Sequence, residues 1–179
     1  MSMLRIPEDR VGALIGKNGE TKKTIEERTE TALKVDPDGE VRIYNRSSDD
    51  PLVVMTVTDL VRAIGRGFSP ERAMRLLEED EYLELIDIKD YVGKKSSHLV
   101  RMRARVIGTR GKTRVLMEEL TGAYISVYGT TVAIIGNSVQ MPITRIAVDM
   151  LLRGSEHSTV YRYLERQRAT LRIAEMGFD

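Results

Sequence analysis

Apolar residues recur along the chain at two different spacings. Residues 51–64 carry apolar side chains three and four positions apart, which predicts an amphipathic helix. Residues 32–35 and 41–44 alternate between apolar and polar, which predicts two short strands. The segment Pro37-Asp38-Gly39 between them has the composition of a tight turn. The chain is therefore predicted to have an α+β fold.

The predicted elements of the first part of the chain follow the order β-α-α-β-β-α. Besides the elements just named, this part contains a strand at 4–6 and helices at 7–15 and 20–29. The same order returns later in the chain. Its elements are a strand at 83–88, helices at 96–107 and 112–120, strands at 123–127 and 131–135, and a helix at 142–152.

Four segments follow from this order. They are a first domain at 1–67, a linker helix at 68–80, a second domain at 81–155 and a C-terminal helix at 156–179. Ser69 is suited to the N-cap of the linker helix, and Pro70 to its first turn. A final helix over 158–174 is expected to have no counterpart in the first domain.

The two domains share a repeated tetrapeptide. Gly16-Lys17-Asn18-Gly19 returns as Gly108-Thr109-Arg110-Gly111, an offset of 92 residues. The residues after each copy also correspond without a gap, including a threonine two positions on and a Glu-Glu pair. A single G-x-x-G motif is common by chance, but a copy with matching flanks indicates a duplicated module.

Composition narrows the class of protein. The chain of 179 residues has no cysteine, which excludes disulfides and thiolate metal sites and favours a reducing, cytoplasmic location. The uncharged run from Leu120 to Thr144 could span a bilayer by length, but it contains three glycines and Pro142. Short strands are expected there, and no membrane span.

The net charge of +1 is low for a nucleic-acid-binding protein. The charges are unevenly placed, however, because residues 91–117 hold eight cations and no acid, whereas residues 78–90 hold seven acids. The second domain is therefore expected to be locally basic and to carry most of the affinity for an anionic partner.

A G-x-x-G turn between two helices lets the backbone approach a ligand closely and directs free N–H groups at an anion, most simply a phosphate. An apolar wall beside it would complete a groove for about four unstacked bases of a single strand. The candidate wall residues are Ile15, Val35, Ile107 and Val127. The candidate RNA-binding residues are Gly16, Lys17, Asn18, Gly19, Lys22, Lys23, Arg101, Arg103, Arg105, Gly108, Thr109, Arg110, Gly111, Lys112 and Arg114.

Simpler interpretations compete with each of these. Either tetrapeptide alone could be an ordinary helix-helix turn, and Arg101, Arg103 and Arg105 could form a solvated helix face. The lysines of the first module lie near Glu26 and Glu27, so ion pairs within the helix would weaken phosphate binding at the first glycine loop.

The sequence contains no motif that would support a catalytic function. Gly-Lys-Thr at 111–113 lacks the glycine that a phosphate-binding P-loop requires at position 106, which is Val106. Adjacent glutamates such as Glu118 and Glu119 point about 100° apart on a helix, so they are expected to be solvated and not to share a metal ion. No catalytic residue, metal site or cofactor is predicted.

The order β-α-α-β-β-α with G-x-x-G between the first two helices resembles the type I K-homology (KH) domains that bind RNA. Three segments, 63–73, 125–129 and 150–161, are similar to the archaeal partner-of-NOB family of tandem KH proteins, a resemblance that covers essentially the whole chain. It implies two tandem type I KH domains joined by a short helix, with an extra C-terminal helix. It also implies binding of small-subunit pre-rRNA near its 3′ end during ribosome assembly.

The resemblance further implies two protein partners, the NOB endonuclease that matures this end and the alpha subunit of translation initiation factor two. Lys22 and Arg114 depart from the general KH pattern, in which an aliphatic residue is frequent at that position, so the grooves are expected to be more electrostatic and less selective for bases. The resulting hypothesis is a non-enzymatic protein that binds single-stranded RNA. The alternative is a scaffold for a nuclease or initiation factor that contacts RNA only incidentally, and nucleotide hydrolysis is a distant third.

Overall fold

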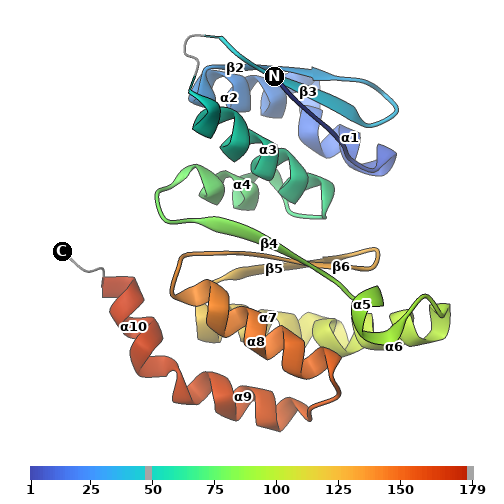
Figure 1. Ribbon diagram of the computed structural model, residues 1–179, viewed down its shortest axis with the longest axis vertical. Coiled ribbons are helices and arrows are strands. Elements are labelled where there is room, and N and C mark those ends of the chain that lie inside the picture. Colours follow the sequence, from blue (N-terminus) through green and yellow to red (C-terminus); the bar gives the residue numbers. More distant parts are fainter. Residues whose placement is uncertain (47–49, 177–179) are drawn as a thin grey trace. The chain divides into compact units, whose positions relative to one another are not determined.

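The computed structural model describes residues 1–46 and 50–176, which divide into two compact units, Met1–Glu79 and Asp80–Asp179 (Figure 1). The first unit contains β1 (Ser2–Arg5), α1 (Glu8–Ile15), the 3₁₀ turn η1 (Lys17–Gly19), α2 (Glu20–Thr29), β2 (Thr31–Val35), β3 (Glu40–Asn45), α3 (Pro51–Gly65), α4 (Pro70–Ala73) and the 3₁₀ turn η2 (Met74–Leu77). Its first six regular elements confirm the predicted order β-α-α-β-β-α.

The second unit repeats this order and adds helices to it. It contains β4 (Tyr82–Asp87), α5 (Lys89–Val92), α6 (Ser96–Ile107), the 3₁₀ turn η3 (Thr109–Gly111), α7 (Lys112–Thr121), β5 (Tyr124–Tyr128), β6 (Thr131–Gly136), α8 (Gln140–Leu152), α9 (His157–Arg166) and α10 (Arg168–Met176).

Each unit has a three-stranded antiparallel sheet in which the last strand lies in the middle, in the orders β1-β3-β2 and β4-β6-β5. The pairing is the same in both, since Leu33 lies opposite Ile43 and Ile125 lies opposite Ile134. The strands β2 and β5, which follow the glycine loop and the next helix, are therefore edge strands. An edge strand leaves half of its main-chain N–H and C=O groups free for other partners.

Three helices cover one face of each sheet, α1 to α3 in the first unit and α6 to α8 in the second (Figure 1). Equivalent positions fill the two cores: Leu14, Ile25 and Leu33 are buried in the first unit, and Val106, Met117 and Ile125 are buried in the second. Burial of these side chains on both sides of each glycine loop fixes the two helices between which the loop lies.

One expectation about the helices was wrong, and one short helix was not anticipated. The C-terminal segment forms two helices instead of one, because the helix is interrupted at Gln167. No glycine or proline marks that break, and Leu171 beyond it is buried in the core of the second unit, so packing decides it. The short helix α5 was not predicted; the Asp87 carboxylate accepts a hydrogen bond from the Lys89 N–H at its start (2.9 Å).

Other local predictions were confirmed. Ser69 caps α4 by accepting a hydrogen bond from the Arg72 N–H (3.3 Å), and Pro70 lies in the first turn. The helical linker ends at Leu77, three residues before the predicted end at residue 80. The uncharged run after Leu120 forms β5 and β6. In the part of the chain that the structure describes, no helix combines the length and the apolar character needed to cross a membrane.

Candidate nucleic-acid interface

The two glycine loops have the same backbone conformation. Gly16, Asn18 and Gly19 have φ of 75°, 56° and 74°, and Gly108, Arg110 and Gly111 have φ of 75°, 57° and 77°. Each loop begins where its first glycine donates a hydrogen bond to the carbonyl four residues before it (2.8 Å) and so ends the helix. Positive φ at three of four positions gives the chain a sharp turn, after which the next helix starts at once. The duplication predicted from the sequence is therefore a duplication of geometry.

The middle residues of both loops are exposed, so neither loop is packed into the interior. Thr109 and Arg110 lie at the surface of the second unit, as do Lys17 and Asn18 in the first. Among the described residues, no acceptor pairs with the main-chain N–H groups of Thr109 and Arg110. These donors stand beside the N-terminus of α7, which is a favourable place for an anion.

The cations around the loops fall into three groups, the third of which consists of Arg103 and Arg105 on α6. Arg101, Arg110 and Lys112 in the second unit are exposed and form no ion pair with any residue described by the structure. Three others pair four residues along their own helices: Lys22 with Glu26 (3.2 Å), Lys23 with Glu27 (3.9 Å) and Arg114 with Glu118 (2.8 Å). The pairing expected within the first module is thus present for Lys22 and Lys23.

The remaining two arginines of α6, Arg103 and Arg105, are partly buried. Arg105 donates from Nε to the Leu151 carbonyl (3.1 Å) and from Nη2 to the Ser155 carbonyl, so it ties α6 to the end of α8. Arg103 is partly buried, and its Nε has no partner among the described residues. Of these three arginines, Arg101 is the exposed one.

The four candidate wall residues, Ile15, Val35, Ile107 and Val127, are all partly buried. In the second unit both α6 and α7 pack against the edge strand β5, and Val127 of this strand packs against the core. The two helices and the edge strand that would line a groove for a single strand are therefore adjacent.

Glu118 and Glu26 have a role that the sequence interpretation missed. Their side chains are only 11% and 17% exposed, so the expected solvated face is wrong at these two positions. The Glu118 carboxylate accepts the Ile125 N–H of β5 (2.7 Å), and the Glu26 carboxylate accepts the Leu33 N–H of β2 (2.9 Å). Each glutamate therefore joins the helix after the glycine loop to the edge strand and, on its other oxygen, to the cation four residues before it.

Replacing Glu118 with alanine is expected to lower the stability of the second unit by about 2 kcal/mol, the loss of a largely buried, charge-assisted hydrogen-bonded group. Glu119→Ala is the matched control, because Glu119 is exposed on the same helix and its loss should cost under about 0.5 kcal/mol. Denaturant unfolding of the full chain, followed by circular dichroism, measures both. Equal effects of the two substitutions would show that Glu118 does not support β5.

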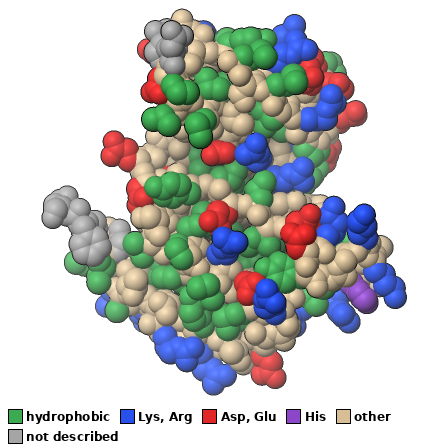
Figure 2. All heavy atoms as spheres, in the orientation of Figure 1, with side chains coloured by type: hydrophobic (Ala, Val, Ile, Leu, Met, Phe, Trp, Pro, Cys, Tyr) green, Lys and Arg blue, Asp and Glu red, His purple; other side chains and the backbone are tan. Residues whose placement is uncertain are grey.

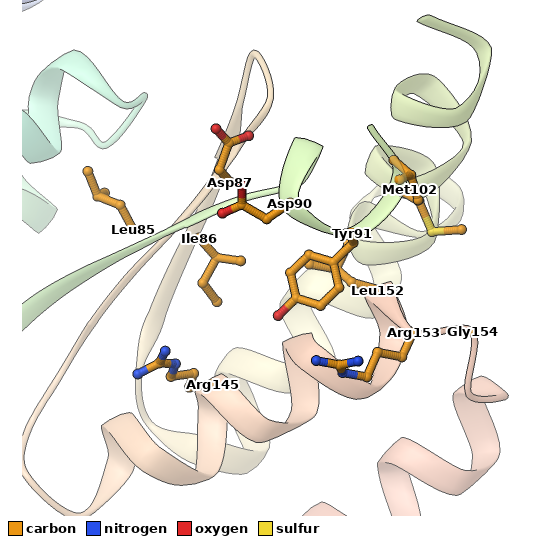
Figure 3. A pocket seen from close by; sticks show the side chains of 11 residues that line it. Leu85, Ile86, Asp87, Asp90, Tyr91, Met102, Arg145, Leu152, Arg153 and Gly154 are labelled. Atoms are coloured by element: carbon orange, nitrogen blue, oxygen red, sulfur yellow. The ribbon is translucent and has the colours of Figure 1, made fainter. Parts of the chain in front are cut away.

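The second unit contains a cavity of about 670 Å³ between β4, α5 and α8 (Figure 3). The charges around this cavity make it unsuited to binding phosphate. Its two arginines are already paired, Arg145 with Glu84 (3.4 Å) and Arg153 with Asp149 (3.0 Å). The Tyr91 hydroxyl donates to Asp149 (2.7 Å), and this hydrogen bond, assisted by Arg153, lowers the pKa of the Asp149 carboxyl. Asp87 and Asp90 add further negative charge at the β4–α5 end (Figure 3).

The distribution of charge on the surface also distinguishes these regions of the second unit. On the face shown in Figure 2, acidic and basic side chains alternate over the middle of the second unit, whereas basic side chains gather around α6 and along α9. Within the described part of the chain, no group of three or more His, Asp or Glu side chains could hold a metal ion. His157, one of the two histidines, instead bonds through Nε2 to the Arg105 carbonyl (2.9 Å).

Family models match both units. Residues 1–63 match the KH domain, and residues 82–169 match the eukaryotic-type (type I) KH domain. A KH domain-containing protein of Methanocaldococcus jannaschii is 49% identical over 175 residues, which cover 97% of this chain and 77% of the relative. The crystal structure of Dim2p from Pyrococcus horikoshii superposes with a TM-score of 0.86 and 53% identity over 92% of this chain and 98% of that one.

The chain belongs to the PNO1/Dim2 family of tandem KH-domain proteins. The fold predicted from the sequence, α+β with two tandem type I KH domains, is therefore confirmed. Both glycine loops lie within the matched segments. A chain in the crystal structure of an a/eIF2alpha–aDim2p–rRNA complex from P. horikoshii is 51% identical, with a TM-score of 0.88 over 94% of each chain.

Eukaryotic PNO1 proteins are more distant. The pre-rRNA-processing protein PNO1 of Eremothecium gossypii is 30% identical over 134 residues, which cover 74% of this chain and 50% of the relative. The chain matches about half the length of such eukaryotic PNO1 proteins.

Proposed function

We propose that this protein binds single-stranded RNA without catalysing a reaction, and that the groove of its second KH domain supplies most of the affinity. One observation carries the proposal: the exposed Gly108–Gly111 loop presents free main-chain N–H groups beside cations that have no acidic partner among the described residues. Main-chain donors and unpaired cations together bind a sugar-phosphate backbone, whereas a partly buried apolar wall suits unstacked bases.

The RNA that we propose is the small-subunit rRNA precursor near its 3′ end. Support comes from relatives named pre-rRNA-processing proteins and from the similar chain solved in a complex with rRNA. The same complex contains a/eIF2alpha, which makes the alpha subunit of translation initiation factor two the first protein partner to test. A NOB-family endonuclease is a further proposed partner and rests on the family resemblance alone.

In the scaffold alternative, the acidic residues 78–90 and the C-terminal helix would dock a protein partner. Several of these acids are engaged within the second unit: Asp80 with the Ser138 hydroxyl (2.9 Å), Glu84 with Arg145 (3.4 Å) and Asp87 with Lys89 (3.8 Å). Fewer charges are then available for a protein partner, which favours RNA binding. Capture of partners that survives nuclease treatment would support the scaffold instead.

Binding of a single-stranded RNA of about ten nucleotides is expected to weaken steeply with salt. Each phosphate contact contributes about −0.7 to the slope of log affinity against log salt concentration, so contacts of Arg101, Arg110 and Lys112 with two to three phosphates predict a slope of about −2. Fluorescence anisotropy between about 50 and 300 mM potassium chloride measures it. A slope near zero, or no binding at the lowest salt, would reject the proposed function.

A further inference from the structure

The second KH domain contains a cavity of about 480 Å³ on the far side of its glycine loop, between α6, the start of α7 and α9. It is separate from the wall formed by β5. Its lining includes Arg101, Gly108, Thr109, Lys112, His157 and Tyr161. Because Gly108 and Thr109 also belong to the Gly108–Gly111 loop, this cavity adjoins the place where the RNA backbone would pass.

The wall on the α9 side is held by hydrogen bonds. His157 donates from Nε2 to the Arg105 carbonyl (2.9 Å), and the Tyr161 hydroxyl donates to Oγ1 of the buried Thr113 (3.2 Å). The two rings also lie near each other, with centroids 6.2 Å apart. Since α9 packs against both α7 and α8, the wall is part of the domain.

The open side of the cavity is cationic. Arg101 on α6 and Lys112 at the start of α7 are exposed, and neither pairs with an acid in the part of the chain that the structure describes. Thr109 adds an exposed hydroxyl. Two unpaired cations and a hydroxyl around one hollow are suited to a phosphate, which accepts several hydrogen bonds and carries negative charge.

The first KH domain provides an internal comparison. At the offset of 92 residues, Arg101 corresponds to Asp9 and Lys112 to Glu20, so both cations are replaced by acids on the same scaffold. A wall like α9 is also missing from its described residues, because the helix after α3 is the four-residue α4, which packs on α3. The described residues of the first unit therefore lack both the two cations and the helical wall that surround this cavity.

We infer that this cavity binds a phosphodiester of the RNA strand, adjacent to the segment that lies in the KH groove. The strand then runs from the groove across the glycine loop and over α9, and Arg101 and Lys112 hold a flanking phosphate outside the groove. The inference rests on the proposed function and extends it, because it predicts a binding site longer than the groove, which suits about four bases.

The test compares two RNA oligonucleotides without terminal phosphates, one of four nucleotides and one of eight. Arg101→Gln/Lys112→Gln is expected to weaken binding of the eight-nucleotide RNA about tenfold and to reduce the steepness of its salt slope by about 0.7, the contribution of one phosphate contact. Binding of the four-nucleotide RNA should weaken clearly less, by about two- to threefold through the loss of positive charge beside the loop, because that RNA fills the groove without reaching α9.

Arg168→Gln/Arg172→Gln is the matched control, because it removes the same charge from exposed positions of α10 and should leave both affinities within about twofold. Equal weakening on both lengths, or none on the longer RNA, overturns the flanking site. Failure of the proposed function has a different signature, namely that the unmodified protein binds neither RNA. Terminally phosphorylated oligonucleotides provide the last arm: if the variant weakens only their binding, the cavity recognises a strand end, and the phosphodiester assignment is wrong.

Discussion

Replacing Thr109 and Arg110 with aspartate is expected to reduce the affinity for single-stranded RNA about 100-fold, or by about 3 kcal/mol. The substitution removes one unpaired cation and places two anions beside the main-chain N–H groups of the loop, where they compete with phosphate. Arg110 has φ of 57°, a conformation that aspartate tolerates, so the fold should persist. Fluorescence anisotropy measures the affinity, and circular dichroism checks the fold.

Lys17→Asp/Asn18→Asp makes the same change in the first domain and is the matched control. We expect less than about a fivefold loss there, because acids already surround this loop: Asp9 and Glu20 occupy positions that are basic in the second domain, and Lys22 is paired with Glu26. Unchanged affinity after substitution of the second loop would reject its assignment as the main clamp. Equal losses from both loops would show instead that the two grooves bind RNA with similar strength.

The features that the sequence predicted well are local or repeated. A few neighbouring residues are enough to predict a glycine at positive φ, a proline in a first turn or an alternating strand. The repeat at an offset of 92 residues shows the glycine loop and the elements around it twice. The fold order, both loops and the exposure of Thr109 and Arg110 could therefore be anticipated. The pairing of Lys22 with Glu26 was also within reach, because it spans one helical turn.

The features that it missed depend on contacts between distant residues. Arg105 resembled its neighbours on α6, yet it meets the Leu151 and Ser155 carbonyls, more than 40 residues along the chain. Glu118 resembled Glu119, and only the position of β5 distinguishes the buried carboxylate from the exposed one. A signal did exist, since Glu26 and Glu118 are equivalent in the repeat and each follows a cation by four residues.

The two glycines of the second loop are expected to respond differently to alanine. Gly108 has φ of 75° and ψ of 174°, a region that essentially only glycine occupies, and an added Cβ would stand 2.2 Å from Thr113 Oγ1 and 2.6 Å from its amide nitrogen. Gly108→Ala should therefore destabilise the second unit by about 4 kcal/mol, combining backbone strain with steric overlap. Gly111, at φ 77° and ψ 9°, has open space around its Cβ position, so Gly111→Ala should cost only about 1 kcal/mol.

Denaturant unfolding of both variants measures these losses, and RNA binding then separates the roles of the two glycines. Gly111→Ala keeps the fold but adds a methyl group on the open side of the loop, where the sugar-phosphate backbone must approach, so affinity should fall about tenfold despite the small loss of stability. Gly16→Ala supplies the parallel test of the first position, because its Cβ would meet Thr21 Oγ1 at 2.2 Å. Full RNA affinity in a folded Gly111→Ala protein would mean that the strand does not approach the backbone at this glycine, and the main-chain clamp would have to lie at Thr109 and Arg110 alone.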